Sequence, residues 1–411
     1  MISLNNVKNV HFVGIGGISM SGLAQILLES GYKVTGSDIN DSNLISKLRK
    51  NGAEVTIPHN PIIVETAELV VYTAAVKQDN CEIIRAKELG IPVIDRATFL
   101  GMIMKDYNYG IAIAGCHGKT TTTSMISIII KNAGMDPTVL VGGEIEAIDG
   151  NVRVGKSEYF VTEACEYCES FLKFYPFVAV ILNIERDHLD YYKDLEHIIS
   201  SFRKFAKLVP ADGALVVCSD NENTLNVSKD VECKVLTYGI KNKADFYARK
   251  IKYDRLGHPS FEVMHRDKKL GTFSLNIPGE HNVLNALAAI AVAYNAGIPM
   301  DTVKKSLKEF KGTYRRFDIK GVRNNITIVD DYAHHPTEIK ATLRAAKQFP
   351  HQKIWCVFQP HTYTRTKTLF KEFSEAFYDA DNVIITDIYA AREKDTGLVK
   401  PSELVDSINK Y

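Results

Sequence analysis

Short apolar runs alternate with glycine turns and helix-like stretches over the first hundred residues. The run "VHFVGI" from Val10 precedes a glycine turn, the helical pattern "SMSGLAQILLESG" and a second run, "KVTGSD". A buried strand, a turn, a helix and another strand are typical of a βαβ unit with parallel strands. Further strands are predicted at "ELVVYTAAV" and "IPVIDR". The pattern predicts one compact α/β domain over residues 1–100.

A second set of apolar runs predicts a larger α/β domain over residues 101–312. The run "YGIAIAG" leads directly into the helix pattern "CHGKTTTTSMISIIIKNAG", which Gly134 should end. "YFVTEA", "FVAVILNI" and "ALVVCSD" extend the predicted sheet. Residues 245–277 instead alternate in polarity and are interrupted by Gly, Pro and charge, which is typical of antiparallel strands. A small antiparallel β-layer is therefore expected, followed by two helices.

The last hundred residues return to the α/β pattern. Strands are predicted at "ITIVDDYAHHP", "KIWCVFQPH" and "NVIITDI". The segment from Gly312 to Gly321 is a candidate linker before them. We therefore expect an α/β protein of three domains, the third covering residues 313–411.

Composition limits the function classes. The 411 residues are 45% hydrophobic, and 50 Lys and Arg nearly balance 49 Asp and Glu. Such a balance gives no strong field that would attract nucleic acid. No run of about 18 apolar residues predicts a membrane span, and the N-terminus lacks a signal-peptide pattern. Seven scattered Cys indicate reduced thiols. We expect a cytoplasmic monomer or homodimer without nucleic-acid or membrane partners.

The turn after "YGIAIAG" is typical of a phosphate-binding loop. A strand that ends at Gly115, turns through Gly118 and starts a helix at Lys119 directs several backbone N–H groups toward one point. Lys119 can neutralise outer phosphates, and the hydroxyl of Thr120 or Thr121 suits Mg²⁺. The usual signature has one more glycine, but the strand–turn–helix context favours a triphosphate site over a plain helix cap.

The first glycine turn has the layout of a dinucleotide fingerprint. Gly14, Gly16 and Gly17 are followed by Ser19 where a third glycine is usual, and Asp38 stands where a ribose-binding acid belongs. Alone, this turn fits NAD as readily as any other ligand with a pyrophosphate and a ribose. A dehydrogenase has no use for a triphosphate loop in its next domain. The two turns together favour a diphosphate-bearing substrate in the first domain and ATP in the second.

Acids, amides and an arginine follow the other strands. Glu163 ends the strand in "YFVTEA", where it can bind Mg²⁺ or cap a helix. His188 follows "FVAVILNI" and can hold a second metal or cap a helix. Asn282 and Asn285 begin a helix, where amides either read an adenine edge or cap the helix. Arg316 reaches a phosphate only if the domains close.

Polar residues also follow the strands of the third domain, in "DDYAHHPTE" and "QPHTYTRTK". We expect them to surround one cleft, since ligands of α/β sheets bind at the carboxyl ends of the strands. Cations, imidazoles and a phenol there suit the carboxylate and ammonium of an α-amino acid. The residues are Asp331, Tyr332, His334, His361 and Arg365.

Taken in order, these motifs resemble those of the Mur ligases of peptidoglycan synthesis. The resemblance covers essentially the whole chain and is carried by "HFVGIGGISMSGLA", "AGCHGKTTTT", "TEACEYCESFL", "NIERDHLDYY", "GEHNVLNALAA", "RRFD", "DDYAHHPTE" and "FQPHTYTRTK". It implies a Rossmann-like UDP-binding domain, a central ATPase domain and a C-terminal Rossmann-like domain. It also implies ATP and Mg²⁺ as cofactors, and an amide-forming reaction between UDP-N-acetylmuramate and L-alanine.

The resemblance implies a role for each matching position. The diphosphate and uridine would contact Gly14, Gly16, Gly17, Ser19, Ser37, Asp38 and Thr73. ATP would contact Gly115, Gly118, Lys119, Thr120, Thr121, Asn282 and Asn285. The metal would be bound by Thr120, Glu163 and His188. The catalytic set would be Lys119, Glu163, His188, Arg316 and His334, and alanine would meet Tyr332, His334, His361 and Arg365.

Two features depart from the family pattern. Some relatives have Arg where Thr362 stands, so carboxylate recognition would depend more on Arg365. The family usually continues beyond the point equivalent to Tyr411, so we expect a shortened third domain. Three alternatives remain open: a recycling ligase that joins a tripeptide to the same UDP-sugar, an NAD-dependent oxidoreductase, and a non-catalytic UDP-sugar-binding homologue.

Overall fold

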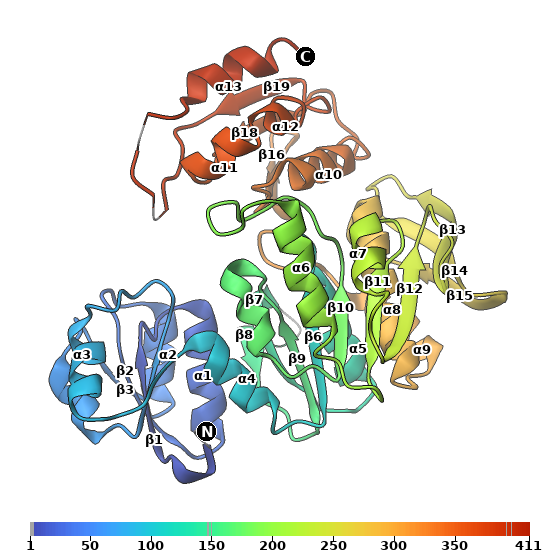
Figure 1. Ribbon diagram of the computed structural model, residues 1–411. Helices are drawn as coiled ribbons and strands as arrows, with labels where there is room; N and C mark the ends of the chain where they lie inside the picture. The colour runs from blue at the N-terminus through green and yellow to red at the C-terminus, as the bar shows by residue number, and fades with distance from the viewer. Residues whose placement is uncertain (1–3, 146–147, 149, 392, 396) are drawn as a thin grey trace.

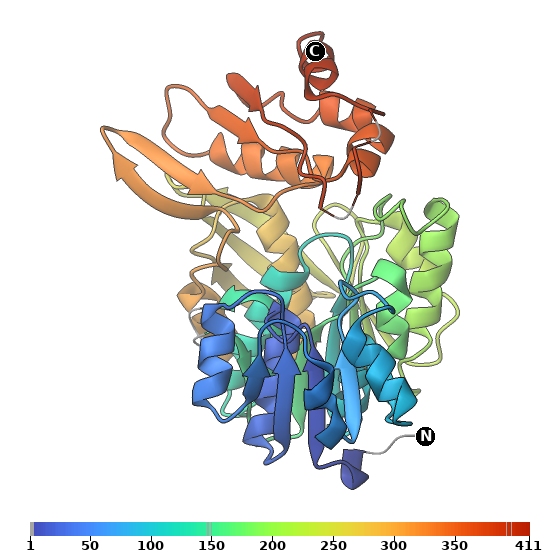
Figure 2. The same cartoon turned by 90° about the vertical axis from the view of Figure 1, so that its left-hand side faces the viewer.

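The computed structural model describes residues 4–145, 148, 150–391, 393–395 and 397–411. It contains three successive α/β units, which Figure 1 colours from blue to red along the chain. The second unit lies in the middle, with the first at its side and the third over one end (Figures 1 and 2). The predicted three-domain α/β fold is confirmed, while the boundaries at residues 100 and 312 stay predictions.

The first unit is a five-stranded parallel sheet in the order β3-β2-β1-β4-β5. Its central strand β1 is buried along its whole length, and three of its five residues are Val or Phe. The strand order reverses beside β1, so ligands are expected at the carboxyl ends of β1 and β4. The strands are β1 (Asn9–Val13), β2 (Lys33–Ser37), β3 (Glu54–Thr56), β4 (Leu69–Tyr72) and β5 (Val93–Asp95). The helices are α1 (Ile18–Glu29), α2 (Asn43–Lys50), α3 (Cys81–Glu88) and α4 (Arg96–Met104).

The central unit is a ten-stranded sheet in the order β15-β14-β13-β12-β11-β10-β6-β9-β7-β8. The strands from β13 to β7 pair in parallel, and β8 is antiparallel to β7. The strands are β6 (Tyr109–Ala114), β7 (Thr138–Ile145), β8 (Gly150–Arg153), β9 (Tyr159–Glu163), β10 (Val178–Ile181), β11 (Ala214–Cys218), β12 (Lys234–Gly239), β13 (Phe246–Tyr253), β14 (Pro259–His265) and β15 (Lys268–Ser274). The predicted antiparallel β-layer is confirmed as β13–β15, which extends the sheet at one edge.

Helices cover both faces of the central sheet. Helices α5 and α8 lie side by side and share one apolar core with the face of the sheet that they cover. The core of the opposite face, which includes α6, is continuous with the core of the first unit. The helices are α5 (Lys119–Asn132), α6 (Leu195–Ala206), α7 (Glu222–Val227), α8 (Glu280–Asn295) and α9 (Met300–Glu309). The shared core fixes the first unit beside β7 and β8.

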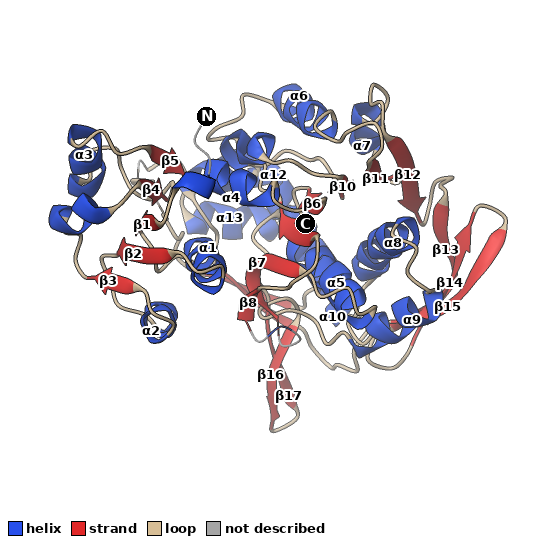
Figure 3. Ribbon diagram, turned by 90° about the horizontal axis from the view of Figure 1, so that it is seen from below, coloured by secondary structure: helices blue, strands red, loops and turns tan. Residues whose placement is uncertain are grey.

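The third unit contains two small sheets. An antiparallel hairpin of β16 and β17 projects away from the other units (Figure 3), and β18 pairs in parallel with β19. An apolar cluster that includes Phe358, Phe373 and Leu404 holds the helices to β18 and β19. The elements are β16 (Asp318–Arg323), β17 (Ile326–Asp330), β18 (Trp355–Phe358), β19 (Asn382–Ile385), α10 (Pro336–Ala346), α11 (Tyr363–Thr368), α12 (Phe370–Ser374) and α13 (Pro401–Ile408). Among the described residues, no helix combines the length and apolarity that a bilayer crossing requires.

Candidate active site

The predicted phosphate loop joins β6 to α5. Gly118 is the N-cap of α5 and has a φ of 82°, a conformation that favours glycine. A Cβ on Gly118 would lie 2.7 Å from the Oδ1 atom of Asn285, and a Cβ on Gly115 would lie 3.0 Å from the Cβ of Leu182. Both glycines are therefore required by their surroundings, and the N-terminus of α5 points its amides toward the loop.

Lys119 is held by groups of the same chain. Its Nζ donates to the two carboxylate oxygens of Glu166 at 3.1 and 3.0 Å and to the carbonyl oxygens of Gly115 and Cys116. Burial alone would lower the pKa of Lys119, but the Glu166 carboxylate raises it above its ordinary value. The ammonium therefore stays charged beside the loop, with Glu166 as its counterion.

Thr120 and Glu163 flank two glycines of β7. A Cβ on Gly142 would lie 3.1 Å from Glu163 Oε2, and a Cβ on Gly143 would lie 3.2 Å from Thr120 Cγ2. The N–H of Gly142 donates to Glu163 Oε1 at 2.7 Å. Mg²⁺ takes oxygen ligands in proteins, and Thr120 and Glu163 carry a hydroxyl and a carboxylate beside these glycines. The metal role of these two residues stays a prediction.

His188 lies beside two acidic side chains, those of Glu166 and Asp187. Its Nε2 is 3.6 Å from Glu166 Oε1 and 3.9 Å from Asp187 Oδ2. These three residues offer ligand atoms within 4.8 Å of one another, and Glu163 is in neither of the two such groups found among the described residues. The structure thus groups His188 with Glu166 and Asp187, and its predicted metal role, like that of Glu163, stays a prediction.

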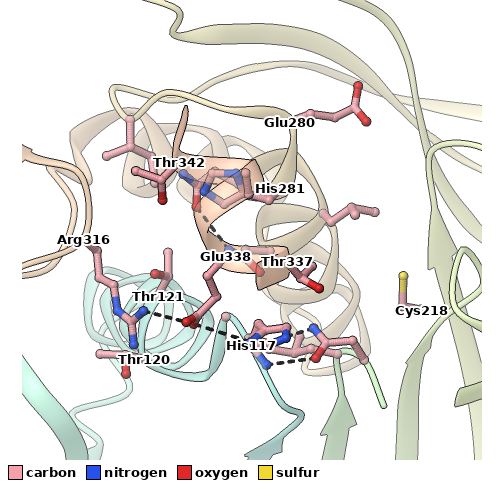
Figure 4. Close-up of a pocket in the computed structure, with 18 of the residues that line it drawn as sticks. His117, Thr120, Thr121, Cys218, Glu280, His281, Arg316, Thr337, Glu338 and Thr342 are labelled. Atoms are coloured by element: carbon pink, nitrogen blue, oxygen red, sulfur yellow. Dashed lines mark hydrogen bonds and ion pairs between the residues drawn. The ribbon is translucent and has the colours of Figure 1, made fainter. Parts of the chain in front are cut away.

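A cavity of about 390 Å³ opens between the central and third units (Figure 4). Asn282 Nδ2 donates to the carbonyl oxygen of Pro278 at 2.7 Å, and Asn285 Nδ2 donates to Asn282 Oδ1 at 3.1 Å. Burial lowers the pKa of His281 to about 4, so a neutral imidazole stands beside these amides. The predicted residues that line the cavity are Gly118, Thr120, Thr121, Asn282, Asn285, Arg316 and Asp331.

Glu338 is an acidic residue of the cavity wall that pairs with two cationic side chains. Arg316 Nη1 lies 3.4 Å and His117 Nδ1 lies 3.5 Å from its Oε1 atom, and Figure 4 shows the carboxylate between them. The backbone N–H of His334 donates to Oε2 at 3.0 Å. Burial would raise the pKa of Glu338, but His117 holds it well below its ordinary value. Burial would lower the pKa of His117, but Glu185 and Glu338 raise it to about 9.

The residues predicted for an amino acid come together on the third unit. The rings of Tyr332 and His334 have centroids 5.4 Å apart, and those of His334 and His361 are 5.9 Å apart. Arg365 Nη1 lies 3.1 Å from His361 Nδ1. Asp331 accepts two backbone N–H bonds of its own unit, at 2.8 Å each. Four of the five predicted residues are therefore assembled in space, while Asp331 lines the cavity beside Arg316, and the ligand role of the cluster stays a prediction.

Arg365 also reaches the central unit. Its Nη2 and Nε atoms donate to Asp187 Oδ1 at 2.9 and 3.2 Å. Burial would raise the pKa of Asp187, but His188 and Arg365 lower it below its ordinary value. The guanidinium predicted to hold a substrate carboxylate is thus paired with a carboxylate of the chain.

In the first unit, the glycine turn after β1 is bonded internally. The N–H of Gly14 donates to the carbonyl oxygen of Ser37 at 2.9 Å, and the N–H of Gly16 donates to Asp38 Oδ2 at 2.8 Å. Thr73 packs against the turn, since a Cβ on Gly14 would lie 2.7 Å from its Cγ2 atom. Helix α1 begins after Gly17 without a side-chain cap bond and contains Ser19. An anion at this turn would therefore meet the N-terminus of α1.

Ser37 belongs to a buried polar network. Its hydroxyl donates to Glu82 and lies 2.7 Å from His59 Nδ1. Glu82 also lies 3.3 Å from His11 Nε2, and neither of these two side chains is exposed. This network joins β1, β2 and α3 at the edge where the uridine is predicted.

Comparison with known proteins covers nearly the whole chain. Residues 9–108 match the family described as "Mur ligase family, catalytic domain", and residues 113–293 match "Mur ligase middle domain". Residues 315–411 match "Mur ligase, glutamate ligase domain". The chain belongs to the Mur ligase family. This membership replaces the dehydrogenase interpretation of the first glycine turn.

Several Mur ligases named for alanine addition are similar to this chain. The UDP-N-acetylmuramate–L-alanine ligase of Caldanaerobacter subterraneus subsp. tengcongensis is 61% identical over 100% of this chain and 89% of that protein. Its counterpart in Alkaliphilus metalliredigens is 56% identical over 99% of this chain and 90% of that protein. The crystal structure of the UDP-N-acetylmuramate–alanine ligase of Thermotoga maritima has 32% identity and a TM-score of 0.82 over 98% of this chain and 88% of that one. A murein peptide ligase of Psychrobacter arcticus has 28% identity and a TM-score of 0.75 over the same shares.

Sequence reasoning missed several residues of this Mur ligase cavity. His117, Glu185, His281 and Glu338 all line it. Each stands inside one of the motifs that carry the resemblance, but the cavity brings together residues of different motifs. The loop residue Cys116 is a buried thiol whose pKa burial raises well above its ordinary value, so it is not a reactive thiolate.

Proposed function

We propose that this Mur ligase joins L-alanine to the lactyl carboxylate of UDP-N-acetylmuramate, with ATP converted to ADP and phosphate. The observation that supports this most strongly is the identity of 61% and 56% to two ligases named for that reaction. The cavity between the phosphate loop, α8 and Arg316 supports an ATP site in the same place. The product is a peptidoglycan precursor.

The reaction has to bring two anions together, the carboxylate of the sugar and the γ-phosphate of ATP. Lys119 beside the phosphate loop and Arg316 in the cavity wall are the cations available to neutralise them. The carboxylate attacks the γ-phosphate in line, which forms an acyl phosphate and releases ADP. The neutral amine of L-alanine then attacks the acyl carbon, and phosphate leaves as the amide forms.

Each ligand has a proposed place. The diphosphate contacts the turn at Gly16 and Ser19, while the adenine contacts Asn282 and Asn285. Thr120, Glu163 and His188 would hold Mg²⁺, which would supply charge neutralisation to the phosphates when bound. The alanine carboxylate contacts Arg365. His334, whose pKa burial lowers, is a neutral imidazole suited to accept the proton of the ammonium.

The tripeptide-recycling activity is the second candidate. It is supported by the murein peptide ligase of Psychrobacter arcticus, which shares the fold at 28% identity. Eight ligases named for alanine are about twice as similar, at 53–61% identity, and the solved structure of the Thermotoga maritima alanine ligase shares 32%. We therefore favour alanine as the amine.

The test is phosphate release from ATP with UDP-N-acetylmuramate and a panel of amines: L-alanine, L-serine, glycine and the tripeptide. We expect release to depend on both the sugar and the amine and to be fastest with L-alanine. Faster release with the tripeptide would assign the recycling activity. No release with any amine, despite measurable binding of UDP-N-acetylmuramate, would favour the non-catalytic homologue.

A further inference from the structure

Three groups with metal-binding atoms converge at the cavity wall, apart from those used in the proposed reaction. They are His117 in the phosphate loop, Glu185 after β10 and His335 at the start of α10. His117 Nε2 lies 3.3 Å and His335 Nδ1 lies 4.0 Å from the same atom, Glu185 Oε2. Two imidazoles and one carboxylate are a ligand set that first-row divalent ions such as Zn²⁺ bind.

The second nitrogen of each imidazole already has an acceptor. His117 Nδ1 lies 3.5 Å from Glu338 Oε1, and His335 Nε2 lies 3.1 Å from the carbonyl oxygen of Arg186. Metal-binding histidines almost always donate their other ring N–H to a carboxylate or a backbone carbonyl, which fixes the tautomer. The same pattern here directs His117 Nε2 and His335 Nδ1 toward the region of Glu185. The ion would replace the proton that His117 Nε2 shares with Glu185 Oε2 at 3.3 Å, and that proton would be released on binding.

The distances suit a small ion. In a tetrahedral site with bonds of about 2.0–2.2 Å, the ligand atoms lie about 3.4 Å apart, and the two distances to Glu185 Oε2 are 3.3 and 4.0 Å. The backbone of His117 is fixed, because Asn183 accepts its N–H at 2.9 Å and donates to its carbonyl at 3.1 Å. His117 and Glu185 line the cavity, which gives an ion a route to the site.

We propose that His117, Glu185 and His335 bind one divalent transition-metal ion of the zinc class. Two of these ligands come from loops of the central unit and the third from α10, so the ion ties the central and third units together beside the nucleotide cavity. The site differs from the oxygen-rich position proposed for Mg²⁺, since imidazoles favour zinc-class ions. The proposal does not depend on which amine the ligase uses.

The ion competes with hydrogen bonds of the protein. Thr337 Oγ1 donates to Glu185 Oε2 at 2.7 Å, and the Thr337 N–H donates to His335 Nδ1 at 3.3 Å. The test variants therefore have to remove a metal ligand and keep these bonds. His335→Asn does so at the start of α10, because Asn is a preferred N-cap. Glu185→Gln keeps an oxygen that can accept from Thr337.

The experiment titrates the full chain with Co²⁺, without nucleotide, and follows its visible absorption. We expect one equivalent to bind, without the intense near-ultraviolet bands of a cysteine ligand, and Zn²⁺ to displace it. His335→Asn and Glu185→Gln should each weaken binding by more than about 100-fold. Glu338→Gln removes only an outer partner, so it should weaken binding by about 10–100-fold. Circular dichroism verifies that each variant is folded.

Two further variants locate the ion. His258→Asn removes an imidazole that pairs with Asp254 at 3.2 Å and does not line the cavity, so binding should be unchanged. His188→Asn tests the other cluster and should also leave it unchanged. The proposal is overturned if the wild type does not bind one equivalent of Co²⁺. It is also overturned if His335→Asn and Glu185→Gln bind Co²⁺ as tightly as the wild type does. Loss in His188→Asn alone would place the ion at that cluster and overturn it as well.

Discussion

The contact between Arg365 and Asp187 should stabilise the docking of the third unit on the central unit. Both side chains are buried, with exposed fractions of 10% and 5%, and two guanidinium N–H groups donate to Asp187 Oδ1 at 2.9 and 3.2 Å. Removal of one partner of a buried ion pair costs about 3–5 kcal/mol, because the other charge loses its direct counterion. We therefore expect Asp187→Asn and Arg365→Met each to destabilise docking by that amount.

Amide hydrogen exchange of α11, which carries Arg365, measures this loss. When exchange is limited by a rapid opening equilibrium, about 1.4 kcal/mol alters the rate tenfold, so the variants should exchange roughly 100–4,000-fold faster. Arg365 also contacts His361 at 3.1 Å, so single variants report more than one contact. The double variant isolates the Arg365–Asp187 interaction, and it should exchange only slightly faster than either single variant.

Arg249 and Glu262 provide a matched control. Their Nε–Oε2 distance is also 2.9 Å, but the Arg249 side chain is 45% exposed. An exposed pair contributes about 0.2–1 kcal/mol, so Arg249→Met should alter exchange of β13 by less than about fivefold. The reasoning is refuted if Asp187→Asn and Arg365→Met accelerate exchange of α11 no more than this control accelerates that of β13.

Three further predictions concern single positions. Lys119→Ala should abolish alanine-dependent phosphate release, while calorimetry should still detect binding of the UDP-sugar. The control is Lys156→Ala, which changes an exposed lysine. Full turnover by Lys119→Ala would show that the phosphate loop is misassigned. Gly118→Ala should weaken ATP binding, because its φ is 82° and its Cβ would lie 2.7 Å from an amide oxygen; an unchanged nucleotide-induced rise in Tm would contradict this. Burial raises the pKa of Glu82, but hydrogen bonds from His11 and Ser37 lower it below its ordinary value of 4.5. Its stabilisation is therefore present above pH 4.5 and lost as the pH falls further, so the Tm difference between wild type and Glu82→Gln should shrink in acid, and a constant difference would contradict it.

Local sequence patterns predicted most of the fold. The glycine turn before α5, the stop at Gly134 with a φ of 78° and the antiparallel strands β13–β15 all follow from neighbouring residues. The parallel pairing of β13 with β12 could not be predicted in this way. Strand partners are chosen by tertiary packing, which a local pattern does not contain.

The motifs of the site could be located from the sequence, but the ion-pair and hydrogen-bond partners of their side chains could not. Glu338 stands three residues after His335, the spacing of a helix capping box, and it makes that box in the structure. Its further contacts with Arg316 and His117 join segments that are far apart in the chain. The same is true of Glu166 and Lys119, since an ion pair forms between whichever charges the fold brings together.

The pairing of cations with carboxylates of the same chain has a consequence for substrate binding. Each cation proposed for an anionic substrate already has such a partner: Lys119 has Glu166, Arg316 has Glu338 and Arg365 has Asp187. Each pair is nearly neutral as a whole before the substrate arrives, so it attracts an approaching anion only weakly at long range. Substrate affinity should therefore respond to ionic strength less steeply than the number of charged contacts suggests.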